Sequence, residues 1–142
     1  EVGDTMEFAE IKIETELAYN LNKYRDPAKK IVFHPKSEGY VGYVVKIGNV
    51  VIYHAGDTDL IPEMQKLTGH GKQGNTFVAL LPVSGTYVMT AEEAAEAASL
   101  LKPSIAIPMH YGAGVVGTIE DAQKFVELCR EKGIHAEVME KI

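Results

Sequence analysis

The feature that most limits the fold is an alternation of apolar strands and amphipathic helices in the second half of the chain. Residues 77–83 and 105–107 are apolar runs of strand length, and an alanine-rich stretch of helical length, 91–101, lies between them. A further stretch, 118–132, also spaces its apolar residues as a helix does. Strands joined through helices pair in parallel and carry those helices on the sheet. We therefore expect an α/β fold with helices on one face, and a nearly continuous apolar run such as 77–83 predicts a strand buried on both faces.

Capping signals mark where the two helices begin. Thr90 is followed three residues later by Glu93, and Thr118 is followed by Asp121 at the same spacing. Side chains in these positions can satisfy the free N–H groups of the first helical turn. Gly133 follows the second helix and favours its end.

The first half of the chain predicts antiparallel strands. Residues 11–17 alternate between apolar and polar side chains, as in a half-buried strand. Residues 43–47 and 50–53 form the clearest hairpin, because Gly48-Asn49 between them is a two-residue turn signal. Together with the parallel pair, these strands predict one mixed sheet.

The remaining segments predict shorter elements. Residues 20–30 are polar and charged and are interpreted as a loop, while 60–67 is a short helix with Asp59 as its N-cap. Residues 136–138 predict a final short strand.

Composition limits the class of protein. The 142 residues are 46% hydrophobic and 24% charged, which predicts a single domain over residues 1–142 with a real core. The balance of 14 basic and 20 acidic residues gives a net charge of −6, which argues against nucleic acid as a partner. No apolar run reaches membrane-spanning length, so no membrane partner is expected. The single cysteine, Cys129, excludes an intrachain disulfide, fits a cytoplasmic location and lies at helical spacing from Phe125, as a buried thiol would.

Three polar residues fall at or near the ends of predicted strands, where functional groups collect in α/β sheets. His34 follows the apolar run 31–33, Asp57 follows the hairpin, and His110 follows the strand at 105–107. Imidazole nitrogens and a carboxylate oxygen are the ligands that a zinc-like ion accepts. The positions therefore raise the hypothesis of a metal site.

Each of these residues also has a purely structural interpretation. His34 could be an exposed loop histidine, Asp57 a turn-forming aspartate, and His110 a core histidine whose hydrogen bonds are satisfied. His54, at the end of the hairpin, could orient another ligand or simply pack in its strand. His70, in a glycine-rich loop, and His135, near the C-terminus, are interpreted as solvated.

Two other motifs point to different chemistry. Gly112, Gly114 and Gly117 have the spacing of a dinucleotide fingerprint between a strand and a helix, which leaves a nucleotide-binding module as a third hypothesis. The matched acidic residue on a second strand is absent, so a loop is the favoured interpretation. Ser84 lacks the Gly-x-Ser-x-Gly elbow of a nucleophile, and a turn is favoured there too.

Several segments resemble one known family. They are Tyr-His-Ala-Gly-Asp-Thr at 53–58, Leu-Leu-Pro-Val-Ser-Gly-Thr-Tyr-Val-Met at 80–89, and Ile-Pro-Met-His-Tyr at 107–111. Ala-Tyr-Asn at 18–20 and Phe-His-Pro-Lys at 33–36 extend the resemblance upstream. In this order the segments resemble metal-dependent hydrolases of the metallo-β-lactamase superfamily, in the branch that includes ascorbate-6-phosphate lactonase-like proteins.

The resemblance implies a role for each candidate residue. Asp57 matches the aspartate that bridges two metal ions, His110 the last histidine ligand, and His34 the middle one. His54 matches a histidine beside the site, so Asp57 and His54 are the implied catalytic residues. The implied cofactor is zinc or another divalent metal such as manganese or iron, and the implied reaction is hydrolysis of a small ester, lactone or phosphoester.

The chain departs from the family in one large respect. The first ligand cluster, His-x-His-x-Asp-His, is absent, and the chain begins at Glu1 rather than at a methionine. The family fold is a four-layer αββα sandwich, so the resemblance implies a C-terminal half, possessing one sheet with an uncovered face. We expect the chain alone to bind metal weakly. We expect it to act on a small-molecule substrate only together with an N-terminal half. The alternative is a non-catalytic interaction module that forms a homo-oligomer through the open sheet face.

Overall fold

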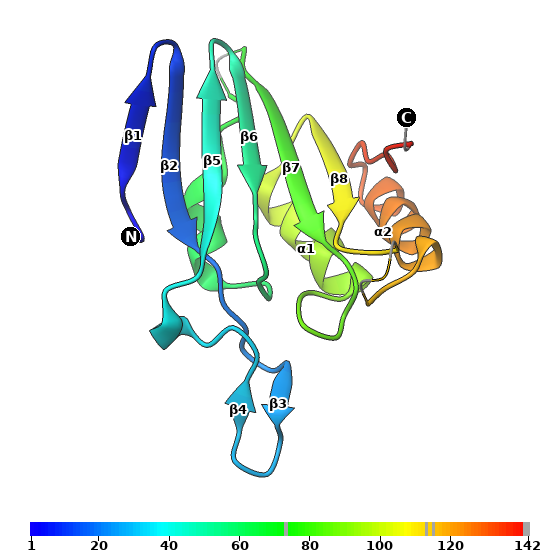
Figure 1. The fold of residues 1–142 in the computed structure, drawn as a ribbon. Coiled ribbons are helices and arrows are strands. Elements are labelled where there is room, and N and C mark those ends of the chain that lie inside the picture. The colour runs from blue at the N-terminus through cyan, green and yellow to red at the C-terminus, as the bar shows by residue number, and fades with distance from the viewer. Residues whose placement is uncertain (73, 113, 115, 141–142) are drawn as a thin grey trace.

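A mixed six-stranded sheet organises the chain (Figure 1). The computed structural model describes residues 1–72, 74–112, 114 and 116–140. The strand order is β1-β2-β5-β6-β7-β8. The bounds are β1 Thr5–Phe8, β2 Ile11–Leu17, β5 Val41–Ile47, β6 Val50–His54, β7 Thr76–Pro82 and β8 Ile105–Met109.

The sheet is antiparallel on one side and parallel on the other. β1, β2, β5 and β6 pair antiparallel, and the predicted hairpin is confirmed because Tyr43 pairs with His54 across β5 and β6. β6, β7 and β8 pair in parallel. The three parallel strands therefore end at the same edge of the sheet, which is also the edge at which β2 ends and β5 begins.

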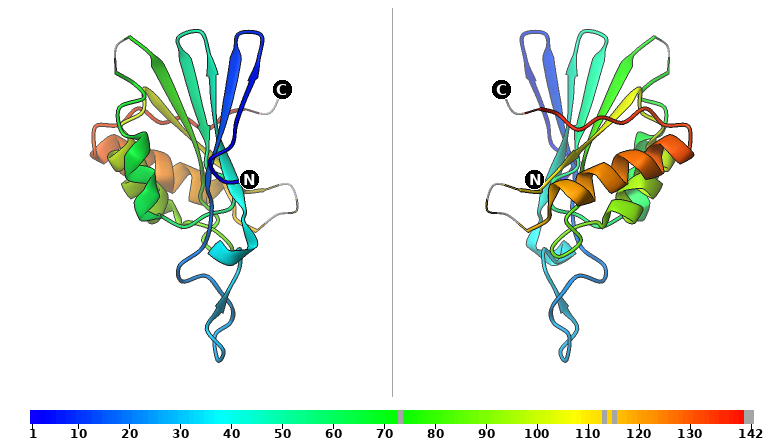
Figure 2. Two further views of the ribbon diagram at one scale, coloured as in Figure 1. Left: turned by 90° about the vertical axis from the view of Figure 1, so that its left-hand side faces the viewer. Right: turned by 90° about the vertical axis from the view of Figure 1, so that its right-hand side faces the viewer.

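Three helices among the described residues cover one face of the sheet, as predicted (Figure 2). They are α1 Ala91–Leu101, α2 Ile119–Glu131 and the 3-10 helix η2 Pro62–Leu67. The capping box of α1 is present, since Thr90 and Glu93 exchange side-chain and backbone hydrogen bonds of 2.8 and 3.2 Å. None of these helices is long and apolar enough to cross a membrane, within the part of the chain that the structure describes.

The core lies between these helices and the sheet. Phe77, Leu81 and Tyr53 point to the helices and are essentially fully buried, as is Cys129 of α2. Burial raises the pKa of the Cys129 thiol to about 11, which agrees with the predicted inert, packed cysteine.

The opposite face of the sheet is open and apolar. Hydrogen-bonded register places a row of aliphatic side chains across five strands, and these are only partly buried: Ile13, Val45, Ile52, Val78 and Ile105. The prediction that strand 77–83 is buried on both faces is therefore wrong for this chain. The helix-facing residues Phe77, Ala79 and Leu81 of β7 are buried, whereas Val78 and Leu80 on the other face are only partly buried, because no described helix lies on that side.

Three smaller predictions are corrected. The expected loop at 20–30 contains β3 Tyr24–Asp26, which pairs with β4 Ile31–Val32 in an arm that extends beyond the sheet (Figure 1). Asp59 is not an N-cap, because η2 begins after Ile61 and the Asp59 carboxylate instead accepts two loop N–H groups. The expected strand at 136–138 is a single bridge between Ala136 and Ala106.

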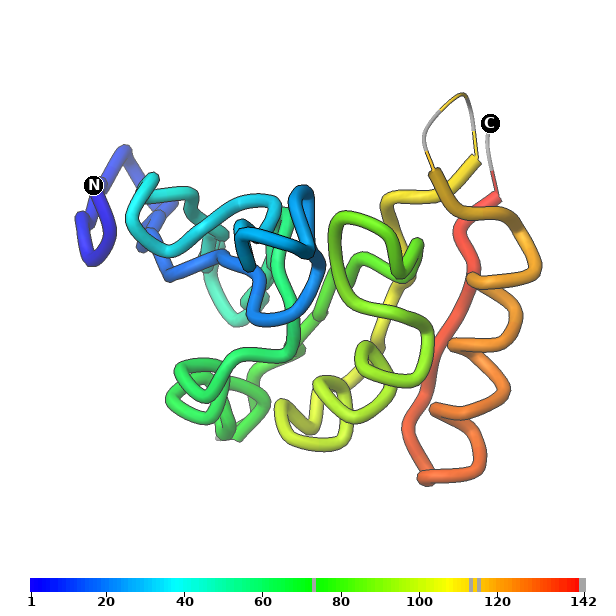
Figure 3. The backbone as a smooth tube through the Cα atoms, turned by 90° about the horizontal axis from the view of Figure 1, so that it is seen from below, coloured from blue at the N-terminus to red at the C-terminus, as the bar shows by residue number. Residues whose placement is uncertain are grey.

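A last short helix, η1 Lys36–Glu38, joins the arm to β5. Seen from below, the segment after β2, the arm and the loops that follow β6, β7 and β8 gather at one end of the sheet (Figure 3). This end carries the residues that the sequence singled out.

Candidate metal centre

The structure brings His34, Asp57 and His110 together at the edge where the parallel strands end. His34 Nε2 lies 3.4 Å from Asp57 Oδ2, and His110 Nε2 lies 3.6 Å from Asp57 Oδ1. His110 directly follows β8, Asp57 follows β6, and His34 follows the short strand β4. The parallel arrangement of β6 and β8 explains why residues so distant in sequence meet.

The backbone is constrained at each of these points. His34 and His110 both have positive φ, at 46° and 62°, which is an uncommon and costly region for residues other than glycine. Gly56 precedes Asp57 with φ of 69°, and a Cβ there would lie 2.8 Å from the carbonyl oxygen of Val41. The loops are thus held in conformations that local preference does not favour, and the surrounding hydrogen bonds must maintain them.

A backbone carbonyl fixes the ring of His34. Its Nδ1 lies 3.2 Å from the carbonyl oxygen of Tyr87, in the loop between β7 and α1. A carbonyl oxygen can only accept, so this contact favours the tautomer that carries its hydrogen on Nδ1 and has a lone pair on Nε2, the nitrogen that faces Asp57. The ring of Tyr40 packs edge-on against His34, with centroids 5.1 Å apart.

A hydroxyl group holds the ring of His110 in place. Its Nδ1 lies 3.0 Å from Ser84 Oγ, in the loop that leaves β7. Gly117 passes so close that a Cβ there would lie 2.6 Å from Ser84 Cβ. Sequence reasoning interpreted Ser84 as a turn residue and missed this contact, because no local pattern links two residues that are 26 positions apart.

The donor set fits divalent metal ions in both chemistry and spacing. Two ligands on a tetrahedral ion with bonds of about 2.0–2.1 Å stand roughly 3.3–3.4 Å apart, close to the 3.4 and 3.6 Å found between Asp57 and the histidines. These separations are too long for good hydrogen bonds, and lone pairs would face each other across them unless a cation or a proton lay between.

The three side chains nevertheless do not form one complete cage. Each oxygen of Asp57 faces a different histidine, so each of two positions has only two protein donors. In keeping with this, no group of three or more His, Cys, Asp or Glu side chains among the described residues is arranged to hold a single ion. The Asp57 side chain is 43% exposed, which leaves its oxygens accessible to further ligands.

His54 lies apart from this cluster. Its Nδ1 accepts a hydrogen bond of 3.2 Å from the Gly56 N–H, and no hydrogen bond or ion pair within the described ranges joins it to His34, Asp57 or His110. With Tyr43 it lines a hollow of about 650 Å³ on the open sheet face. The remaining histidines differ from each other: His135 is exposed as predicted, whereas His70 packs against Phe77 and its pKa is lowered by burial.

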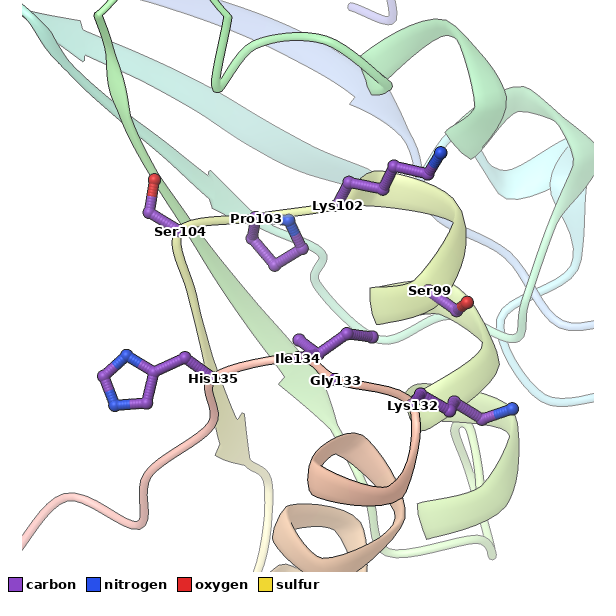
Figure 4. A pocket seen from close by; sticks show the side chains of 8 residues that line it. All are labelled: Ser99, Lys102, Pro103, Ser104, Lys132, Gly133, Ile134 and His135. Atoms are coloured by element: carbon purple, nitrogen blue, oxygen red, sulfur yellow. The ribbon is translucent and has the colours of Figure 1, made fainter.

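A second hollow, of about 430 Å³, lies at the other end of β8 (Figure 4). The C-terminal ends of α1 and α2 border it, and Lys102 and Lys132 directly follow these helices. Cations at these positions complement the partial negative charge of the helix ends. The His135 side chain points away from those of Lys102 and Lys132, so the three do not form a converging site (Figure 4).

The glycine motif at 112–117 is covered only in part, since residues 113 and 115 lie outside the described residues. Gly112 N–H donates to the Gly117 carbonyl at 3.0 Å, which closes the segment into a loop beside His110.

Comparison with known proteins gives a consistent picture. The sequence profile of one family, described as a beta-lactamase superfamily domain, matches residues 3–110. A UPF0173 metal-dependent hydrolase of Symbiobacterium thermophilum is 40% identical over 101 residues, which cover 71% of this chain and 45% of the relative. One from Caldivirga maquilingensis is 36% identical over 123 residues, which cover 86% of this chain and 51% of the relative. The chain therefore spans about half the length of the curated relatives it matches.

Solved structures share the fold over the whole chain. A protein from Parabacteroides distasonis, assigned as a metal-dependent hydrolase, superposes with a TM-score of 0.74 at 31% identity, covering 99% of this chain and 56% of the other. A metallo hydrolase from the archaeon Ignicoccus hospitalis gives a TM-score of 0.71 at 27% identity, with the same coverage. The sheet with helices on one face thus matches a little over half of each of these solved chains.

Proposed function

Because this chain belongs to the metallo-β-lactamase superfamily, we propose that it supplies half of the metal centre of a hydrolase, with His34, Asp57 and His110 as ligands. The observation that carries the proposal is the position of the Asp57 carboxylate between the two histidines. Its Oδ2 lies 3.4 Å from His34 Nε2, and its Oδ1 lies 3.6 Å from His110 Nε2. This is the arrangement expected of a carboxylate shared between two metal positions. Each position then needs donors from outside the chain.

The chain's own residues prepare the ligands for this role. The Tyr87 carbonyl and Ser84 Oγ hold the Nδ1 atoms of His34 and His110, so both Nε2 atoms face the carboxylate. Divalent ions bound there would acidify a water molecule and polarise the bond to be cleaved. Nitrogen and oxygen donors without thiolate suit zinc, and also manganese or iron.

The substrate class follows the parent chemistry, hydrolysis of a small ester, lactone or phosphoester, as in the ascorbate-6-phosphate lactonase-like branch. His54 contributes beside the metal centre rather than as a ligand, because its Nδ1 is already engaged by the Gly56 N–H and no hydrogen bond or ion pair among the described residues joins it to the cluster. The relatives extend well beyond the part that this chain matches, and in our proposal an N-terminal segment supplies the other half of the site.

Metal content per chain tests the proposal. We expect sub-stoichiometric zinc in the dialysed chain, no zinc in Asp57→Ala, and an unchanged low content in the control Asp26→Ala, which alters a carboxylate on the arm. Adding the N-terminal segment of a UPF0173 relative should raise zinc in the wild type toward stoichiometry but not in Asp57→Ala. Zinc bound equally by wild type and Asp57→Ala in both conditions would refute the assignment.

A second candidate function is self-association without catalysis. The observation that favours it is the exposure of large apolar side chains on the open face, where Phe8 is 78% and Met6 66% exposed. Apolar patches of this kind mark interaction surfaces. Light scattering over a range of concentrations tests it: a dimer supports the homo-oligomer, and a monomer at high concentration excludes it.

A further inference from the structure

Asn20 occupies a central place beside the candidate metal centre. It lies in the segment that leaves β2 at the edge where His34 and Asp57 meet, and only 3% of it is exposed. Its backbone N–H donates to the His34 carbonyl at 3.1 Å, and its side-chain Nδ2 donates to the Tyr87 carbonyl. Asn20 therefore touches both the ligand residue and the group that fixes the ligand ring.

The Tyr87 carbonyl oxygen is shared by two nitrogens. It accepts from Asn20 Nδ2 and lies 3.2 Å from His34 Nδ1, while the two nitrogens are 3.3 Å apart. A carbonyl oxygen has two lone pairs, so it can accept from two donors side by side. With Asn20 donating, the carbonyl is held where the His34 ring can donate through Nδ1.

The Asn20 amide is oriented so that, among the described residues, its nitrogen is paired and its oxygen is not. Its Oδ1 is buried and has no hydrogen-bond partner among the described residues. A buried acceptor without a partner is unfavourable and calls for a physical explanation. Here the explanation is Tyr87, because the flipped amide would place Oδ1 against the Tyr87 carbonyl oxygen.

The preceding residue anchors the same segment to the chain that follows Asp57. Tyr19 N–H lies 3.2 Å from Thr58 Oγ1, and its carbonyl accepts from Thr58 Oγ1 at 3.0 Å and from Asp59 N–H at 2.9 Å. The segment is thus bonded to the loops that carry His34 and Asp57. This gives Asn20 a fixed support from which to act on His34.

We propose that Asn20 is a positioning residue for His34: its amide fixes the Tyr87 carbonyl, which keeps the hydrogen of the His34 ring on Nδ1 and directs the Nε2 lone pair toward Asp57. The inference rests on the proposed metal centre. Its first readout, the position of the ring hydrogen, is measured without metal and so stands apart from metal binding.

The first experiment is ¹⁵N NMR of histidine-labelled, metal-free chain at a pH where the rings are neutral. His34→Gln assigns the His34 signal. We expect the Nδ1–H form in the wild type and in the control Asn75→Ala, which lies away from this end of the sheet. Asn20→Leu, which keeps the branched shape but removes the amide, should shift His34 toward the Nε2–H form, and Asn20→Ala should do the same. A retained Nδ1–H form in both folded variants would overturn the proposal.

Zinc titration provides the second measurement. Loss of a group that orients a metal ligand typically weakens metal binding about 10- to 100-fold, so Asn20→Leu should do so. In a His34→Ala background the same substitution should have little further effect, because it acts through His34. An equal loss in both backgrounds would show a general structural role. Absence of any Asp57-dependent zinc binding in the wild type would count against the metal centre, while the NMR result would still decide the role of Asn20.

Discussion

His34 and His110 share an uncommon backbone conformation, and this gives the site its character at the scale of single residues. A left-handed conformation costs roughly 1–2 kcal/mol for a residue with a Cβ, so both loops depend on tertiary contacts to remain in place. For His34 the contacts are the carbonyl of Tyr87 and the segment at Asn20. For His110 the contact is Ser84, which Gly117 in turn allows to approach.

Gly117→Ala tests that dependence. The new Cβ would meet Ser84 Cβ at 2.6 Å, on a backbone with φ of 100°, so we expect a loss of about 1–3 kcal/mol in the free energy of unfolding and weaker zinc binding. Urea unfolding and zinc titration measure the two effects. Gly114→Ala is the matched control, since its φ is also positive at 86° but nothing lies within 4 Å of the added Cβ. Equal effects of both variants on zinc binding would contradict the role of the Ser84 contact.

At the scale of elements, a buried ion pair connects the β3–β4 arm to the rest of the fold. Lys23 Nζ lies 2.6 Å from Asp59 Oδ1 and 2.8 Å from Glu93 Oε2 at the start of α1. Lys23 is 9% and Asp59 3% exposed. The base of the arm, the loop after Asp57 and the N-terminus of α1 are therefore held as one unit.

Removing one member of this network should be costly. Leaving an unpaired charge in a buried site destabilises a protein by about 3–5 kcal/mol, so Lys23→Ala should lower the free energy of unfolding by an amount near that range. Lys29→Ala is the control, because its pair with Asp26 is 3.7 Å long, 75% of the Lys29 side chain is exposed, and such pairs contribute about 0–1 kcal/mol. Urea unfolding compares them. Similar small losses in both variants would mean that the Lys23 pair is not effectively buried.

At the scale of the whole molecule, the main feature is the open sheet face, which is apolar and which no described helix covers. Hydrogen bonding across the sheet aligns aliphatic side chains on that face from β2 to β8, whereas α1, α2 and η2 cover the other face. Solved relatives possess nearly twice the length, since this chain covers 56% of them. A second layer of protein on this face would remove the apolar surface from water.

Paired substitutions on β1 test whether a second copy covers that face. Successive residues of a strand point to opposite faces, so Phe8 lies with Met6 on the open side and Glu7 on the other. If the chain dimerises through this face, Phe8→Lys should weaken the dimer at least tenfold, whereas Glu7→Lys should leave it unchanged. Sedimentation at several concentrations measures both. Equal dimerisation of the two variants would exclude the open face as the interface.

The sequence by itself determined the two long helices and the central hairpin, because their signals are local. The capping box at Thr90 begins α1, the turn at Gly48-Asn49 sets the hairpin, and the resemblance singled out Asp57 and His110. Only the tertiary structure decided the pairing of Ser84 with His110 and of Asn20 with Tyr87, and the use of Asp59 as an ion-pair partner. These contacts join residues from 26 to 67 positions apart, and a local pattern carries no information about which distant loops the sheet brings to one edge.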